Sequence, residues 1–245
     1  MLKHIYSISK RELKGYFGSP VAYVFIVIFL ILCGFFTFQL GQFYEARQAD
    51  LRAFFIWQPW LYLFLIPAAA MRLWAEERRS RTIEILFTLP VTVGETVLGK
   101  FLASWLFIGI ALLLTFPLVI TVLYLGNPDM GSIATGYLGC FLMAGAYLAV
   151  GSLMSSLTRS QVIGFVLSVM VCLLLVLIGW PPITNWLVAM TDKASIVNFI
   201  AGFSFISHFE SIERGVLDSR DLLYFGSVIV FMLFVNTTML NLRKA

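Results

Sequence analysis

Charged side chains are scarce in this chain of 245 residues: only 12% are Asp, Glu, Lys or Arg, whereas soluble domains carry about 25%. Hydrophobic residues make up 60% of the chain. One soluble core cannot hide so many apolar side chains, so the composition indicates an integral membrane protein, which its long apolar runs predict to be all-α. The small net charge of +4, with no long basic patch outside the membrane flanks, gives no reason to expect a nucleic-acid partner.

Cysteine and histidine are also rare. The three cysteines, Cys33, Cys140 and Cys172, are scattered through apolar runs and have neither a pairing framework nor metal-ligand spacing. Free cysteine commonly packs as a small hydrophobic residue. Only two histidines are present, His4 and His208. We therefore expect no catalytic residue, no metal site and no cofactor-binding site in this chain.

Six apolar runs are long enough to cross a bilayer, whose hydrocarbon core takes about 20 helical residues. They are residues 21–40, 54–74, 101–125, 133–157, 162–180 and 222–242, within one transmembrane domain that covers 1–245. Residues 1–19 have one apolar and one basic face, a pattern typical of an interfacial helix. In the outer loop 183–221, Ile196–Phe209 is apolar but too short to span, which favours a re-entrant element.

The basic residues predict the orientation of these six spans. An even number of spans places both termini on the same side as the connection 75–100. Twelve of the 17 lysines and arginines fall on that side and five on the other. Because basic loops stay inside, we expect both termini to be cytosolic in a multi-pass protein of the inner (plasma) membrane. The segment 183–221 would then face outward.

The connection 75–100 is the largest charged island, and a nucleotide site is one interpretation of it. The spacing of Gly94, Gly99 and Lys100 resembles a P-loop. A P-loop requires Ser or Thr next, to bind magnesium, and a strand before it. Phe101 follows Lys100 here, and the segment leads into a membrane span. Gly99 and Lys100 are better interpreted as shaping and anchoring the end of the third span.

Two other functions are less consistent with the sequence. Glu76-Glu77-x-x-x-Arg81 matches a signature of CAAX-type intramembrane proteases, which need histidines near the glutamates. The expected topology puts His208 on the opposite side of the membrane from Glu76. A secondary transporter normally places ionisable groups inside its spans, and the interiors of the expected spans contain no Asp, Glu, Lys or His. Both interpretations are therefore disfavoured.

The island also contains a short amphipathic segment, Thr82–Leu89, which ends at Pro90. On a helix, Ile83, Leu86 and Phe87 would share one face. A short amphipathic helix at the membrane surface docks either on lipid or in a protein groove. The glutamates around it favour a protein over an anionic lipid surface.

The pattern AEERR…TIEIL…LPV…GK over residues 75–100 resembles the signature of ABC-2-type ABC transporter permeases, the type V exporter class. The chain departs from the usual pattern at Arg81, where many members have Gly. The likeness covers the whole chain, including the interfacial helix, the six spans and the long outer loop. The segment HFES…RGV…RDLLYF over residues 208–225 is similar to the gliding-motility branch of that family.

The resemblance implies a permease without its own ATPase. Thr82–Pro90 would be the coupling helix, seated in a cleft of a separate ATPase dimer that binds ATP and magnesium. A second permease chain, identical or a sister, would complete the path, with the outer segment as its roof and an accessory protein as a further outer partner. The implied coupling residues are Glu76, Glu77, Thr82, Ile83, Glu84, Leu86, Phe87, Pro90, Gly99 and Lys100. A membrane scaffold that does not transport remains an alternative.

Overall fold

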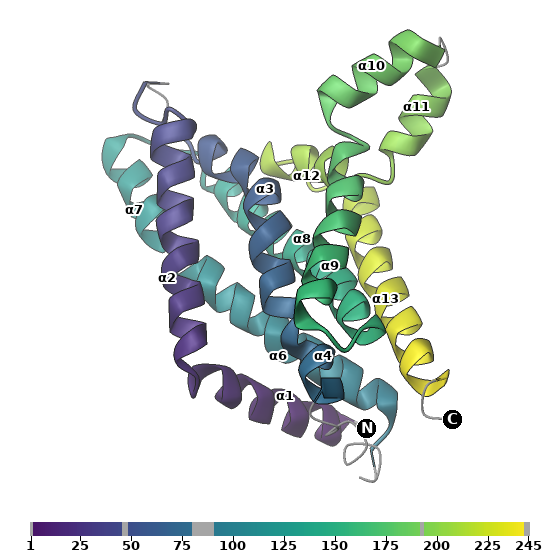
Figure 1. The fold of residues 1–245 in the computed structure, drawn as a ribbon. Coiled ribbons are helices and arrows are strands. Elements are labelled where there is room, and N and C mark those ends of the chain that lie inside the picture. Colours follow the sequence, from purple (N-terminus) through teal and green to yellow (C-terminus); the bar gives the residue numbers. More distant parts are fainter. Residues whose placement is uncertain (1, 46–48, 80–90, 192–193, 243–245) are drawn as a thin grey trace.

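The computed structural model describes residues 2–45, 49–79, 91–191 and 194–242. All regular elements of this part of the chain are helical, so the all-α prediction is confirmed. Five stretches of the described residues are long and apolar enough to cross a membrane, and the bent pair α9–α10 makes a sixth if it is counted as one span. The helices stand side by side in a bundle (Figure 1).

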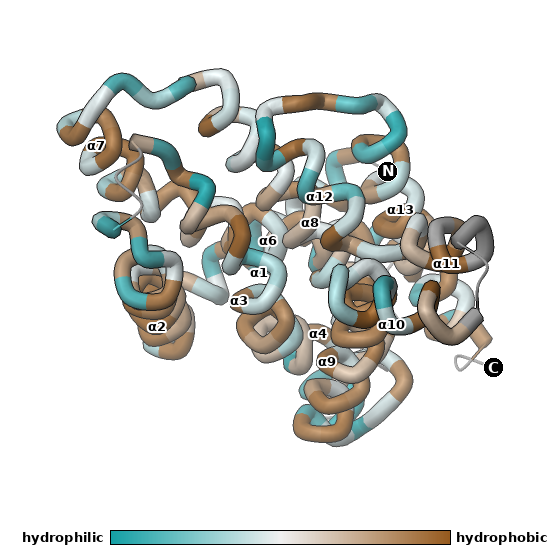
Figure 2. Tube along the Cα trace, turned by 90° about the horizontal axis from the view of Figure 1, so that it is seen from above, coloured by the Kyte–Doolittle hydropathy of each residue, from teal (hydrophilic) through white to brown (hydrophobic). Residues whose placement is uncertain are grey.

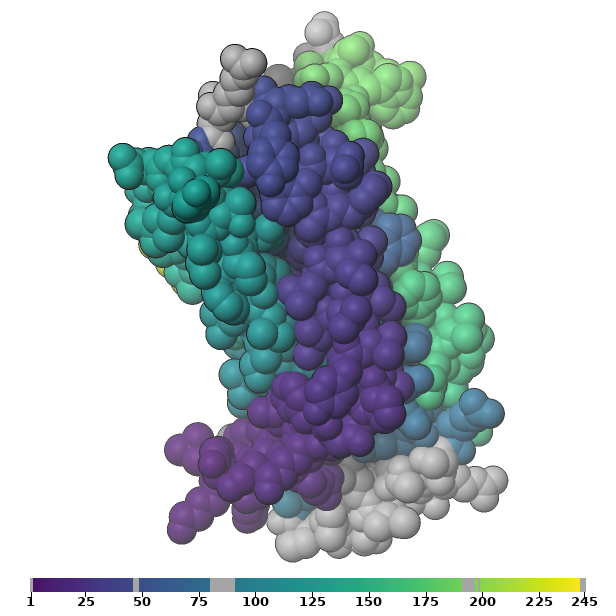
Figure 3. Space-filling view, turned by 90° about the vertical axis from the view of Figure 1, so that its left-hand side faces the viewer, coloured from purple at the N-terminus to yellow at the C-terminus, as the bar shows by residue number. Residues whose placement is uncertain are grey.

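The first helix, α1 (Leu2–Phe17), lies across one end of the bundle, and α2 (Pro20–Phe35) rises from it (Figures 1 and 3). The chain turns between them at Gly18 and Ser19. The Ser19 hydroxyl accepts a hydrogen bond from the Val21 amide at 3.3 Å, and Pro20 occupies the first helical position, where its missing N–H is not needed. A π-helical turn, Phe36–Leu40, continues α2.

The second membrane stretch consists of α3 (Arg52–Ala70) and α4 (Arg72–Arg79), which are separated by Met71. Pro67 lies inside α3. The structure places the break four residues later. Met71 donates its amide to the Pro67 carbonyl at 2.9 Å, so the helical turn that contains Pro67 is closed.

The helix of the third stretch begins before the expected range 101–125 and is interrupted within it. It begins at Val93 rather than at residue 101, so Gly99 and Lys100 lie inside a helix rather than in a connection. It is also divided into α6 (Val93–Leu113) and α7 (Phe116–Leu125). Pro117 lacks the N–H that a continuous helix would bond to Leu113, and the Thr115 hydroxyl donates to the Leu112 carbonyl at 2.6 Å at the end of α6.

The longest helix, α8 (Met130–Leu157), runs through the centre of the bundle, and α9 (Gln161–Leu177) packs beside it. The small residues of α8 permit close contacts with neighbouring helices. A Cβ added at Gly151 would lie 2.5 Å from the Cβ of Ala70 in α3. A larger residue at position 151 would therefore push α8 and α3 apart.

The connection 183–221 is largely helical. It forms α10 (Pro181–Thr191), α11 (Ala194–Ala201) and α12 (Phe205–Glu213), which lead into α13 (Ser219–Leu242). The pair α10–α11 projects beyond the bundle, and α12 returns to it (Figure 1). The apolar stretch 196–209 is thus divided between two helices. The break occurs because the Ser204 hydroxyl accepts from the Ile206 amide at 3.2 Å and starts a new helix.

The outer faces of α2 and α9 are predominantly hydrophobic (Figure 2). Val24 on α2 is 55% exposed and Val166 on α9 is 50% exposed. Contiguous exposed apolar surface of this kind marks contact with lipid or with another chain. The helices thus bury one face in the bundle and offer the other to a membrane.

Candidate functional site

The structure describes four of the ten residues that the sequence assigned to coupling. Glu76 and Glu77 lie in α4, while Gly99 and Lys100 lie in α6. The other six lie outside the described residues. They are Thr82, Ile83, Glu84, Leu86, Phe87 and Pro90. The site can therefore be built from the two helices that flank residues 80–90.

A buried lysine joins these two helices. The Lys100 Nζ lies 2.7 Å from Glu77 Oε1 and 3.3 Å from Glu12 Oε1 of α1. Lys100 is only 4% exposed, and its Nζ also lies 5.7 Å from the centre of a Trp74 ring. A buried ammonium is stable only when it is paired and hydrogen-bonded. We call Lys100, Glu77 and Glu12 the lysine cluster, and it connects α6, α4 and α1.

Close packing holds α1 against α6 at the neighbouring residue. A Cβ on Gly99 would lie 2.7 Å from the Cγ2 of Ile8, so only glycine permits this approach. The Ser9 hydroxyl donates to the Gly99 carbonyl at 2.9 Å. One turn later, the Tyr16 and Ser104 hydroxyls are 2.8 Å apart. The helix α1 is therefore fastened to α6 over two turns.

The beginning of α6 is defined by a capping box. The Thr92 hydroxyl accepts from the Glu95 amide at 3.2 Å, and a Glu95 carboxylate oxygen accepts from the Thr92 amide at 2.9 Å. The sequence prediction missed this start, although Thr-x-x-Glu before an apolar run is its known signature. Because of this cap, Lys100 lies two turns inside the helix and faces Glu77.

Ser155 of α8 occupies the break between α3 and α4. Its hydroxyl accepts from the amides of Trp74 and Ala75, each at 3.2 Å, and donates to the Met71 carbonyl at 2.9 Å. The first turn of a helix lacks amide partners within its own helix. A buried side chain of α8 thus supplies partners for the start of α4.

A second polar contact on α8 secures Trp74 itself. The Trp74 indole donates to the Ser152 hydroxyl at 3.1 Å, and the Asn236 amide of α13 donates to the same oxygen at 2.9 Å. All three side chains are buried. Neither Ser152 nor Asn236 had a sequence signal, because single polar residues in apolar spans are common. The result is that α4, α8 and α13 are joined directly behind the lysine cluster.

The two histidines lie at opposite ends of the bundle. The Nδ1 of His4 in α1 is 3.6 Å from Glu95 Oε1. The Nδ1 of His208 in α12 is 2.6 Å from Asp221 Oδ1 at the other end. A protease site would need them near Glu76, and they are not brought together there. Over the described ranges, no group of three or more His, Cys, Asp and Glu side chains could hold a metal ion.

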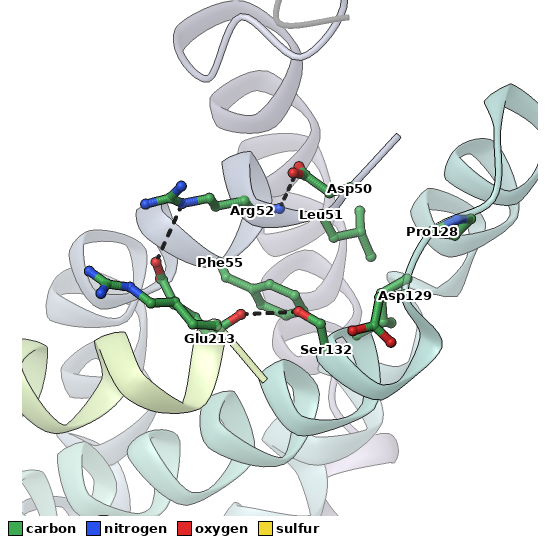
Figure 4. A pocket seen from close by; sticks show the side chains of 10 residues that line it. Asp50, Leu51, Arg52, Phe55, Pro128, Asp129, Ser132 and Glu213 are labelled. Carbon is green, nitrogen blue, oxygen red and sulfur yellow. Dashed lines mark hydrogen bonds and ion pairs between the residues drawn. The ribbon is translucent and has the colours of Figure 1, made fainter. Parts of the chain in front are cut away.

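A second group of charged residues surrounds a pocket of about 220 Å³ at the end of the bundle that carries α12 (Figure 4). Its Glu213 side chain is 5% exposed, and Oε1 lies 3.9 Å from the Arg52 Nε. Burial raises the pKa of the Glu213 carboxyl from 4.5 to about 7, although Arg52 and Arg214 oppose this shift. Glu213 is therefore a weakly compensated buried acid.

Replacing Glu213 with glutamine should change how stability depends on pH. Between pH 4.5 and 7 the folded state keeps a proton that the unfolded state has released, so the wild type loses stability as the pH rises through this window. At pH 8 Glu213→Gln should be more stable than the wild type by up to about 3 kcal/mol. The difference should vanish near pH 4.5. Thermal unfolding in detergent at pH 5 and pH 8 measures this.

Glu210→Gln is the matched control, because Glu210 is an acid of the same helix whose side chain is 43% exposed. It should show the same pH dependence as the wild type. Parallel pH profiles for Glu213→Gln and the wild type would contradict the assignment of Glu213 as a buried, weakly compensated acid.

Comparison with known proteins agrees with this architecture. The family model described as ABC-2 family transporter protein matches residues 6–240, which is nearly the whole chain. A search of individual curated proteins found no match. Members of the family are membrane components of transport systems rather than catalysts themselves. The chain, with its apolar helical bundle, belongs to the ABC-2 family of transporter permeases.

Proposed function

We propose that this chain is the permease subunit of an ABC exporter, driven by ATP hydrolysis in a separate ATPase dimer that holds the ATP and magnesium. The lysine cluster is the observation that carries the proposal. Residues 80–90 contain the proposed coupling helix, and both flanking helices, α4 and α6, meet at Lys100. Force applied to the proposed coupling helix would therefore act on α4 and α6 together.

The polar contacts on α8 support a route for this force. On one side of residues 80–90, α4 is held by Ser155 and by Trp74, and it continues into α3 beyond Met71. On the other side, α6 is tied to α1 through Gly99. Movement at the coupling helix would therefore tilt the second and third spans relative to α8, while α1 follows α6.

The proposal includes an orientation and further partners. The α1 end would be cytosolic in the inner membrane, so that α10 and α11 face outward. Their apolar side chains include the exposed Trp186 and Phe199, which suits contact with a second permease chain or an outer accessory protein. The transmembrane domain would be shared with that second copy or a sister permease. The gliding-motility branch remains our assignment within the family.

Charge and polarity changes in the proposed coupling helix test this function. Glu84→Arg or Leu86→Arg should reduce co-purification with the ATPase at least about tenfold. Glu84→Arg reverses a charge at the proposed interface, and Leu86→Arg replaces an apolar contact with an unpaired charge. Stimulated ATPase turnover should fall with it. The readouts are pull-down from native membranes and ATP hydrolysis by the reconstituted complex.

Glu210→Arg is the control, since it makes the same charge change as Glu84→Arg but on α12, at the end of the bundle opposite α1. It should assemble normally. Unchanged assembly and transport in both coupling-helix variants would refute the docking role of residues 82–90. A complex that assembles but neither stimulates the ATPase nor transports would favour the scaffold.

A further inference from the structure

A groove of about 590 Å³ opens beside the lysine cluster. Its sides are α2 and α3, which diverge toward the α1 end of the bundle (Figure 1), and α1 closes it below. Its back wall includes Lys100 and Phe107 of α6. The volume is in the range of small-molecule binding clefts. The groove is therefore large enough for a ligand and is bounded by α1, α2, α3 and α6.

The lining changes from apolar to charged along the groove. Aliphatic and aromatic side chains such as Val24, Phe25 and Leu65 line its length, and Ala68 and Ala69 leave room between them. On α2 the lining runs from Val21 to Ile28, about 10 Å at 1.5 Å per residue. Half of a bilayer core is about 15 Å thick. The apolar part thus matches a large fraction of one leaflet.

The charged rim lies at the depth of lipid headgroups. An interfacial helix lies at the boundary between headgroups and acyl chains, and α1 contributes Glu12 and Tyr16 to the groove. The rim carries three carboxylates, Glu12, Glu76 and Glu77, and two cations, Arg72 and Lys100. Lys100 is buried within the lysine cluster. Arg72 is exposed and forms no ion pair among the described residues, so it is available to a phosphate.

We propose that this groove binds one glycerophospholipid with a zwitterionic, primary-ammonium headgroup, namely phosphatidylethanolamine, from the leaflet on the α1 side. One acyl chain lies between α2 and α3, and the phosphate accepts hydrogen bonds from Arg72. The ammonium donates to the carboxylates of the rim, which a quaternary choline cannot do. The anionic headgroup of phosphatidylglycerol has no ammonium to donate to these carboxylates. The lipid thereby fills the space between α2 and the lysine cluster.

Native mass spectrometry of the detergent-purified chain tests this. Phosphatidylethanolamine, phosphatidylcholine and phosphatidylglycerol with identical acyl chains are added in equal amounts. The wild type should hold one phosphatidylethanolamine per chain. Ala69→Phe should reduce its occupancy about tenfold by filling the groove, and Arg72→Gln should weaken it about tenfold by removing a charge-assisted contact.

Val166→Phe is the matched control, because it adds the same ring to the exposed face of α9, and it should bind as the wild type does. Thermal unfolding shows that each variant is folded. If Ala69→Phe fails to fold, the lipid binding of Arg72→Gln decides the test. Arg72 is exposed, so its replacement should leave the fold intact. Equal retention of all three lipids, undiminished binding by a folded Ala69→Phe variant, or a dimer in which the second copy fills the groove would overturn the proposal. The assay contains no ATPase, so its result is separate from that of the coupling test.

Discussion

Replacing Lys100 with methionine should destabilise the protein by about 3 kcal/mol, because it leaves two carboxylates facing each other without their cation. This is the low end of the usual cost for breaking a buried pair, since Glu77 and Glu12 keep 22% and 23% side-chain exposure. In detergent, the unfolding temperature should fall on the order of 10 °C. Methionine preserves the length of the side chain, so the loss reports the charge.

The double variant Lys100→Met, Glu77→Gln should recover part of this loss, since a neutral group replaces the carboxylate nearer to position 100. Lys14→Met is the control, because Lys14 is an exposed cation of α1 and should change stability by less than about 0.5 kcal/mol. If Lys100→Met unfolds at the same temperature as Lys14→Met, the lysine cluster does not hold the three helices together. A double variant that is less stable than Lys100→Met would contradict the electrostatic explanation.

Ser155→Ala should have an effect of similar size, a loss of about 2–4 kcal/mol. The hydroxyl accepts from the amides of Trp74 and Ala75 and donates to the Met71 carbonyl in a fully buried site. Buried backbone groups that lose their partners cost about 1–3 kcal/mol each, and neighbouring groups recover only some of these bonds. The free energy of unfolding in a denaturant titration measures the loss.

Ser168→Ala is the matched control for Ser155. Its hydroxyl is equally buried but donates at 2.7 Å to the Gly164 carbonyl of its own helix, one turn earlier. Such a bond supplements one that the helix already makes, so its removal should cost less than about 1 kcal/mol. Equal effects of the two substitutions would show that Ser155 does not stabilise the start of α4.

Local sequence patterns located the helices but not all of their ends. The expected span 54–74 falls within α3 and α4, and the basic and apolar faces of residues 1–19 correspond to α1. Two features of the third stretch do not follow from its apolar run. Thr92 and Glu95 start α6 before its apolar run begins, and Pro117 interrupts that run. Hydropathy averages over both features, because caps and breaks depend on single backbone groups.

The coupling residues also show which features the sequence predicts and which only the structure reveals. The sequence selected Glu77, Gly99 and Lys100 as part of a family signature, but it gave Lys100 only a general anchoring role. Glu12 was not selected, since one acid in a basic helix carries no signal. Its partner is distant along the chain and is reached only because α1 lies against α6 at Gly99. Ser155 was missed for the same reason.

By itself, the sequence determined that this protein is a helical membrane protein, because the length of apolar runs and the scarcity of charge are properties of consecutive residues; its resemblance to a family signature pointed to a permease. The tertiary structure alone decided which charges meet. A buried ammonium cannot remain unpaired in an apolar bundle, so Lys100 pairs with carboxylates from α4 and α1. That pairing depends on the packing of helices distant in sequence, which no local pattern encodes.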